Sequence, residues 1–565
     1  MNENQAVEIQ RMPRKNVWLL LFLGIAGAYL FHGVVFYGHP LGINVLIAVL
    51  CCYGVILGSQ KGNLNLRRQQ NWLLLPFIAA LCATFFLYNN LLLLILNGIA
   101  VALLIPLQIS LMTDTASYPA YTFGSFCDVF FCLFVRPFHR IGQSFPALFR
   151  GFSGKEVSGK NTKYIWIGIL IALPVVAALT ALLSSADMVF SDMLSRLSTK
   201  TILDGLGYLV LAAAVCTLSA SFIYSLAAKK RAVVPPAQGN RPEFSLISVY
   251  IVLISVSLLL FIFGVIQCLF LFGGAALPEG VSYSTYARTG FFQLCAASVL
   301  VFCLTAVCMA FTKQAQAKQA RFLRILYTWL NASNILLLVS SFCRMVLYEQ
   351  AYQYTQLRLY VQFFILLLGA ILVLTILKIW RQKFPLAKCV CFAILISLSA
   401  LSYFNVDGFI ARENSRNMPA ALKEDSDGMP EDPMGYLYSL SADALPGYAH
   451  LLLDEDFLDD TAFRQYQKYA NFADFHKNDF PDGLFPNELA KDENEFYATL
   501  ARYQNTARYY QWRARNIFSL YKECKNNSGD LRSYNTGRAA ALEFFTSHPE
   551  FLEKLQSFQA QDIDG

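Results

Sequence analysis

The chain has 565 residues, of which 56% are hydrophobic and 15% are charged, and its formal net charge is +7. Soluble proteins carry about 25% charged residues, so the composition excludes the three or four soluble domains that the length would allow. The charge divides into +18 over residues 1–404 and −11 from residue 405 onward, and this division argues against a nucleic-acid partner.

Apolar runs of membrane-spanning length follow a polar N-terminus, residues 1–16, that we expect in the cytoplasm. The first run is too long for the apolar region of a signal peptide. In lipid the backbone must satisfy its own hydrogen bonds, so runs of about 20 residues predict helices. We expect eleven spans, at about 17–36, 41–59, 72–88, 91–111, 164–184, 203–227, 245–272, 290–312, 325–343, 358–378 and 386–404.

The spans form two groups, residues 17–227 with six and residues 245–404 with five, separated by a proline-containing cytoplasmic linker at 228–244. A long cytoplasmic loop at 112–163 mixes Phe and Leu with arginines, which is typical of a helix lying in the membrane interface. Such a helix could contact lipid as a lateral gate, or pack under the helix bundle. The second interpretation is favoured.

The distribution of basic residues predicts the orientation. With a cytoplasmic N-terminus, the inside segments hold 24 Lys and Arg residues, and the outside loops hold only Arg196, Lys200, Arg288, Arg344 and Arg358. Basic residues concentrate on the cytoplasmic side of membrane proteins. An odd number of spans then places residues 405–565 outside.

Residues 405–565 predict a mostly helical, acidic, extracytoplasmic domain. Aromatic residues recur there at helical spacing, and we expect them to form its core rather than a ligand-binding stripe. Thirteen of the fourteen cysteines precede residue 404 and only Cys524 lies in this domain, so we expect no disulfide within it.

The sequence lacks the phosphate-binding, zinc-protease, serine-hydrolase and dinucleotide motifs of soluble enzymes. Its six histidines have no metal-ligand spacing. We therefore predict no cofactor and no metal, and we assign no catalytic residue.

Three polar clusters stand at span ends on the predicted outer face. They contain Tyr286 and Arg288; Arg344, Tyr348, Glu349, Tyr352, Thr355 and Arg358; and Asn405, Asp407 and Arg412. If the second cluster is helical, Arg344, Tyr348, Tyr352 and Thr355 share one face. Charged groups near bilayer depth are costly and are usually paired or functional, and the candidate partners of the arginines are Glu349 and Asp407.

These clusters allow three interpretations. The favoured one is a salt-bridged seam, belted by tyrosines, that holds the last spans together and orients the C-terminal domain. The second is an arginine-lined outer pocket for a phosphate or carboxylate group, which the arginine side chain suits. The third is general acid–base catalysis by Glu349 or Asp407.

The second cluster resembles a bacterial polytopic membrane family described only as a domain of unknown function, marked by Arg…Leu-Tyr-Glu-x-x-Tyr-Gly-Leu-Thr-x-Leu-Arg. The chain matches this pattern at Arg344, Leu347, Tyr348, Glu349, Tyr352, Thr355, Leu357 and Arg358. It departs at Gln353 and Tyr354, where the family usually has Gly-Leu. The segments YARTGFFQL, Asn405–Arg412 and Tyr436–Pro446 are also similar to the family. The resemblance implies a bacterial inner or plasma membrane location and no established activity.

We therefore expect an all-α polytopic membrane protein of about eleven transmembrane helices with a C-terminal extracytoplasmic domain. The favoured function is a non-enzymatic envelope role in sensing, assembly or transport, in contact with the bilayer and with an anionic lipid or an envelope protein at the outer face. The alternative is a membrane enzyme or flippase acting there on an anionic or lipid-linked substrate.

Overall fold

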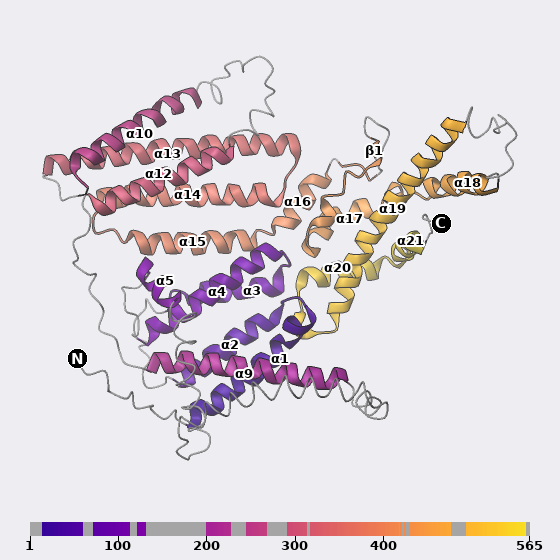
Figure 1. Cartoon of the computed structure of the whole chain (residues 1–565), viewed down its shortest axis with the longest axis horizontal. Coiled ribbons are helices and arrows are strands. Elements are labelled where there is room, and N and C mark those ends of the chain that lie inside the picture. Colours follow the sequence, from indigo (N-terminus) through magenta and orange to yellow (C-terminus); the bar gives the residue numbers. More distant parts are fainter. Residues whose placement is uncertain are drawn as a thin grey trace, which may run out of the picture. The chain divides into compact units, whose positions relative to one another are not determined.

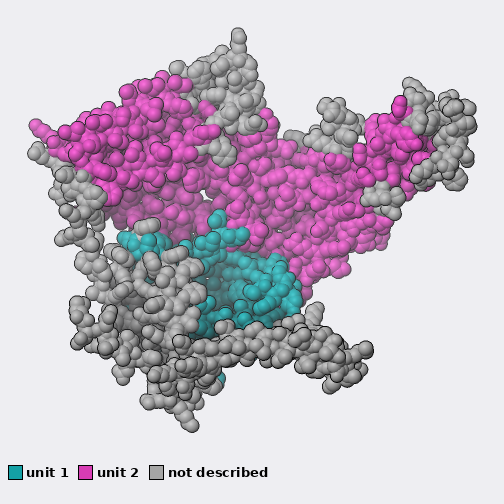
Figure 2. Space-filling view, viewed as in Figure 1, with its two compact units in different colours: residues 1–86, 95–239 teal, residues 87–94, 240–565 magenta. Residues whose placement is uncertain are grey.

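The computed structural model describes residues 14–59, 72–113, 121–130, 199–227, 244–267, 291–312, 317–416, 418–420, 423–424, 430–475 and 493–560. The elements in these ranges are helices, apart from one short antiparallel pair, β1 (Lys423–Glu424) and β2 (Pro430–Glu431). The predicted helical fold class is therefore confirmed. The chain divides into two compact units, residues 1–86 with 95–239 and residues 87–94 with 240–565 (Figure 2).

Unit 1 contains helices that are apolar almost throughout. They are α1 (Arg14–Tyr37), α2 (Ile43–Ser59), α3 (Leu75–Leu87), α4 (Leu91–Met112), α5 (Phe123–Phe130) and α9 (Thr199–Ala227), with the facing ends of α3 and α4 counted in unit 2. Helix α1 packs against α2 and α9. A Cβ at Gly24 would lie 2.8 Å from the carbonyl oxygen of Ala212, so glycine allows α1 and α9 to approach closely.

In unit 2, five apolar helices pack together (Figure 1). They are α10 (Leu246–Gln267), α12 (Phe291–Phe311), α13 (Ala317–Tyr352), α14 (Gln356–Trp380) and α15 (Leu386–Tyr403). Helix α13 packs against α10, α12 and α14, and α14 is also in contact with α15. It has 36 residues, a length of about 54 Å, and extends beyond the expected span at both ends.

Seven helices in the described ranges are long and apolar enough to cross a membrane: 15–37, 91–112, 246–266, 293–311, 317–350, 356–380 and 386–403. Helices 43–59, 75–87 and 204–220 are apolar but shorter. The expected span 164–184, the linker 228–243 and most of the loop 112–163 lie outside the described residues. The count of eleven spans therefore stays a prediction.

The remainder of unit 2 is a set of shorter helices. They are α16 (Val406–Ser415), η4 (Leu437–Ser439), η5 (Ala442–Ala444), α17 (Leu445–Leu452), η6 (Glu455–Leu458), α18 (Thr461–Phe475), α19 (Glu493–Ser528), η7 (Leu531–Ser533), α20 (Thr536–Ser547) and α21 (Pro549–Ala560). Their shared core contains Tyr448, Phe457, Phe463, Phe545 and Phe558. The prediction that the aromatic residues of this region form a core is confirmed.

One charged pair is enclosed in that core. Arg513 of α19 is fully buried, and its Nη2 lies 2.6 Å from Oδ1 of the equally buried Asp432. Its Nη1 also donates to the carbonyl oxygens of Ala420 and Phe457, at 2.6 and 3.1 Å. A buried guanidinium needs this number of acceptors, since each unsatisfied polar group in a core is costly.

Candidate functional site

The start of α16 fixes the position of Asp407. Asn405 adopts a left-handed backbone conformation with φ of 49°, which asparagine tolerates better than most residues, and its side chain accepts a hydrogen bond from the Gly408 backbone N–H at 3.0 Å. A Cβ at Gly408 would lie 2.6 Å from the Asn405 amide nitrogen, so the cap requires glycine there. Asp407 consequently lies in the first turn of α16, with 1% of its surface exposed.

The Asp407 carboxylate joins three separate segments of unit 2. Its Oδ1 accepts from Asn90 Nδ2 at 3.0 Å and from Gln356 Nε2 at 2.6 Å. Its Oδ2 accepts from the backbone N–H of Ser441 at 3.2 Å. Asn90 precedes α4, Gln356 begins α14 and Ser441 precedes η5, so one buried carboxylate connects segments far apart in sequence.

A second carboxylate, that of Asp443, is buried in the same region. Its Oδ2 accepts from the backbone N–H of Asn89 at 2.5 Å and from Ser441 Oγ at 3.2 Å. Burial raises the pKa of Asp443 from 3.8 to about 6, and the negative charge of Asp407 adds to the rise, while the N–H bond from Asn89 opposes it. Keeping Asp443 ionised in the folded protein therefore costs free energy.

The start of α20 holds the same segment from another side. Asn535 Nδ2 donates to the carbonyl oxygen of Tyr88 at 2.7 Å, and Thr536 Oγ1 donates to that of Leu87 at 2.6 Å. Arg538 Nη1 donates to Asn89 Oδ1 at 2.9 Å, and burial lowers the pKa of Arg538. We call Asp407, Asp443, residues 87–90 and residues 535–538 the junction.

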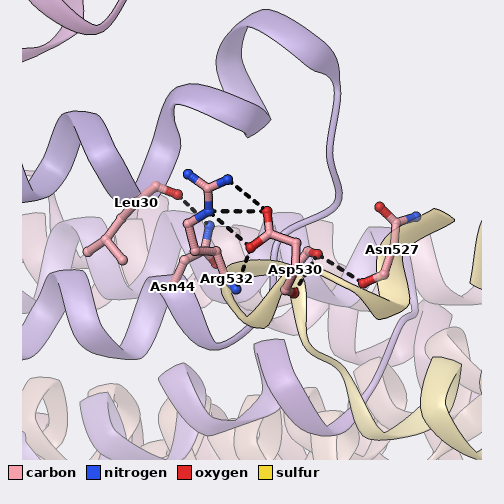
Figure 3. A network of polar contacts seen from close by, with 6 residues as sticks. Leu30, Asn44, Asn527, Asp530 and Arg532 are labelled. Carbon is pink, nitrogen blue, oxygen red and sulfur yellow. Dashed lines mark hydrogen bonds and ion pairs between the residues drawn. The ribbon is translucent and has the colours of Figure 1, made fainter.

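The turn before α20 is stabilised by its own polar contacts (Figure 3). Asp530 accepts from the backbone N–H of Arg532 at 2.9 Å and pairs with the Arg532 guanidinium, Nη2 to Oδ2, at 2.9 Å. Ser533 Oγ donates to the Asn527 carbonyl oxygen at 3.3 Å, tying the turn to the end of α19. These contacts fix the turn that leads into residues 535–538, which bond to residues 87–89 within the junction.

The turn between α13 and α14 is tied to α16. Helix α13 ends at Tyr352, Gln353 has φ of 66°, and Thr355 is the extended residue directly before α14. Tyr354 and Asn414 bond reciprocally, the Tyr354 N–H to Asn414 Oδ1 and Asn414 Nδ2 to the Tyr354 carbonyl oxygen, both at 2.9 Å. Thr355 therefore does not share the α13 face that the spacing predicts, because the positive φ of Gln353 has already turned the chain.

Arg358 and Tyr348 lie together beside this turn. The guanidinium of Arg358 is 4.2 Å from the Tyr348 ring centre, and its Nη1 donates to the carbonyl oxygens of Tyr352, at 2.9 Å, and Gln353. Within the described residues no ion pair joins Arg358 to Glu349 or Asp407. The expected salt bridge is replaced by carbonyl and aromatic contacts, because α13 stops before Arg358 and exposes its last carbonyl groups to this side chain.

Arg344 and Glu349 are instead buried among the helices of unit 2. Glu349 Oε2 accepts from Gln362 Nε2 of α14 at 2.5 Å, whereas Glu349 Oε1 has no hydrogen-bond partner in the part of the chain that the structure describes. Both residues belong to the apolar span 317–350. Ionisable groups in such a position are rare and costly.

Three of the predicted residues are still to be placed: Arg412, Tyr286 and Arg288. The Arg412 side chain is 64% exposed and its nearest carboxylate is the neighbouring Glu413, at 4.0 Å. Tyr286 and Arg288 lie outside the described residues. Of the eleven predicted residues, the structure brings Asp407 into the junction and places the Asn405 cap beside it.

The contacts of the junction suit a structural role. The bonds of Asp407 come from amide groups of the protein itself, and in the described ranges no group of three or more His, Cys, Asp and Glu side chains could hold a metal. A carboxylate saturated in this way holds segments together, whereas a catalytic base must reach a substrate proton.

Most residues of the junction could not be predicted from the sequence. Asn89, Asn90, Gln356 and Arg538 were not selected, although two adjacent asparagines between apolar runs at 89–90 are a usable signal for a satisfied polar contact. Ser441 and Asp443 lie in the Tyr436–Pro446 segment that carries the family resemblance.

A family model described as "Domain of unknown function (DUF4153)" matches residues 75–451. No curated protein and no solved structure matches the chain. The matched range includes residues 87–90, Asp407 and Asp443, and ends before residues 535–538.

Proposed function

This chain belongs to the DUF4153 family of domains of unknown function, and from that premise we propose that it is a non-enzymatic membrane protein that carries its acidic C-terminal domain in a fixed orientation on the outer face, as a docking platform for an envelope partner. The membrane helices supply the anchor and the junction supplies the fixed orientation.

The observation that carries this proposal is the Asp407 carboxylate. It is buried, and its bonds to Asn90, Gln356 and Ser441 link the ends of two apolar helices to the segment that leads into the C-terminal helices. Hydrogen bonds to a charged group contribute about 1.5–3 kcal/mol each, so the arrangement resists separation of these segments. A platform that presents a partner-binding surface needs this rigidity.

The fixed orientation is tested by Asp407→Ala. Loss of the carboxylate leaves the amides of Asn90 and Gln356 without their acceptor, so we expect lower thermal stability and faster protease release of the C-terminal helices from the purified protein. Arg412→Ala on the same helix is the matched control, because Arg412 is largely exposed. An Asp407→Ala protein with unchanged melting and proteolysis would show that the junction does not hold the domain.

The outer location is tested separately by Leu531→Cys. Leu531 is 81% exposed, in the turn before α20, and the only native cysteine from residue 405 onward, Cys524, is buried. A membrane-impermeant maleimide should label Leu531→Cys in intact cells above the wild-type background. Labelling that requires broken cells would place the domain inside and end the proposal of an outer platform.

The alternative function, a membrane enzyme or flippase for an anionic or lipid-linked substrate, is favoured by one observation. Glu349 and Arg344 are buried within the span 317–350, and Glu349 Oε1 has no hydrogen-bond partner among the described residues. Glu349→Gln keeps the shape and the bond to Gln362. If this variant is made at normal yield but fails to replace the wild type in cells that lack the protein, the enzyme or flippase is supported over the platform.

A further inference from the structure

A cavity of about 260 Å³ lies at the other end of α13 and α14, among the end of α12, the beginning of α13 and the end of α14. Its lining includes the apolar side chains of Leu323 and Ile379 and the basic side chains of Arg324 and Lys378. Nothing in the junction uses these residues. Arg324 and Glu349 are 25 residues apart on one helix, which is about 37 Å.

Within the described part of the chain, no acidic side chain neutralises the two cations of this cavity. Glu349 is the only acidic residue between positions 291 and 404, and no described carboxylate forms an ion pair with Arg324 or Lys378. The Lys378 ammonium donates to the carbonyl oxygens of Gln382 and Phe384, at 2.6 and 2.9 Å, so one of its three donors remains. The positive charge of the cavity is therefore available to an anion.

Exposed tryptophans mark the depth of the cavity. Trp329 of α13 and Trp380 of α14 are each about half exposed, and Trp380 Nε1 donates to Thr328 Oγ1 at 3.0 Å. Tryptophan concentrates at the level of lipid headgroups. Arg324 and Lys378 are within one to two turns of these tryptophans along their helices, and the apolar Leu323 and Ile379 are their direct neighbours in sequence, so cations and apolar side chains of the cavity lie at the level of the tryptophans.

We infer that this cavity binds the phosphate of an anionic phospholipid, with Arg324 and Lys378 as the phosphate-binding residues and Leu323 and Ile379 against the glycerol end of the chains. Arginine suits phosphate because its planar group donates several hydrogen bonds, and lysine adds a point charge. Basic pockets at helix ends attract anionic lipid headgroups. A lipid is favoured over a soluble phosphate because the cavity combines the cations with apolar walls at the tryptophan level.

The test is native mass spectrometry of the full-length protein in detergent with added phosphatidylglycerol or phosphatidylcholine. Wild type should bind phosphatidylglycerol more tightly than phosphatidylcholine. Arg324→Gln should weaken phosphatidylglycerol binding about tenfold, as expected for the loss of one charge-assisted bond. Arg321→Gln, the same change one turn earlier on an exposed residue outside the cavity, should change the affinity less than about twofold.

Three results would overturn the inference. Equal binding of both lipids by the wild type means that the cavity does not select an anionic lipid, because phosphatidylcholine has the same phosphate group but no net charge. This comparison does not depend on any variant. Equal weakening by Arg321→Gln and Arg324→Gln means that the attraction is diffuse. Displacement of phosphatidylglycerol by millimolar inorganic phosphate means that the ligand is a soluble anion.

Discussion

Replacing Asp443 with asparagine is predicted to stabilise the protein at neutral pH. Both hydrogen bonds to the Asp443 side chain, from the Asn89 N–H and from Ser441 Oγ, end on the same oxygen, Oδ2. The amide oxygen of asparagine can occupy that position and keep both bonds. The substitution therefore removes a buried charge close to Asp407 without removing its two hydrogen bonds.

The magnitude follows from the pKa of Asp443, which burial raises from 3.8 to about 6. Because the folded state binds this proton more tightly than the unfolded chain, the contribution of Asp443 to stability is largest below about pH 4, falls as the pH rises from about 4 to about 6, and is constant above. The loss corresponds to about 3 kcal/mol as an upper limit. For a domain of 150–250 residues this is roughly 6–12 °C in melting temperature.

The assay is thermal unfolding of the purified protein between pH 4 and pH 8. Asp443→Asn should melt above wild type at pH 7.5 and should lose the fall between pH 4 and 6. Asp460→Asn is the control, because Asp460 is half exposed and pairs with Arg464 at the surface, where ion pairs contribute little. An Asp443→Asn protein that melts lower than wild type at pH 7.5 would refute the reasoning and would show that attraction to Arg538 outweighs burial.

Two further changes test the packing around the junction and the core. Gly537→Ala would place a Cβ 1.7 Å from Asp443 Oδ1, so we expect the free energy of unfolding to fall by about 1–3 kcal/mol, measured by thermal unfolding. Asp443→Ala in the same chain should recover part of this loss. Additive losses in the double variant would contradict the contact. Arg513→Met leaves Asp432 buried without its partner and should lower the free energy of unfolding by about 3–5 kcal/mol, measured by denaturant unfolding of the purified protein. Arg513→Met combined with Asp432→Leu should lower it less. An equal or greater loss in the double variant would contradict the explanation from a buried unpaired charge.

The positions of the apolar helices could be predicted from the sequence. Helices α1, α2, α4, α12, α14 and α15 begin and end within a few residues of the expected spans. Length and hydropathy suffice because lipid leaves a long apolar run no alternative to a helix. The ends of α13 were predicted less well, because the helix continues through exposed polar residues such as Lys318 and Arg321, which hydropathy does not assign to a span.

The polar residues at the span ends show the limit of this reasoning. The sequence identified Asp407 as important and suggested an arginine partner, because charge is the property a sequence displays. The partners are instead the neutral amides of Asn90 and Gln356 and a backbone N–H. Neutral donors carry no charge, so the sequence does not show which carboxylate they bind, and only their positions in space identify them as the partners of Asp407.

The sequence by itself determined that this chain is helical, that much of it is apolar enough for a membrane, and which family it resembles, because each of these depends on local pattern. Only the tertiary structure decided that residues 87–90, 407, 441–443 and 535–538 meet around two buried carboxylates. These segments are separated by up to about 450 positions, and hydrogen bonding acts over about 3 Å in space whatever the distance along the chain.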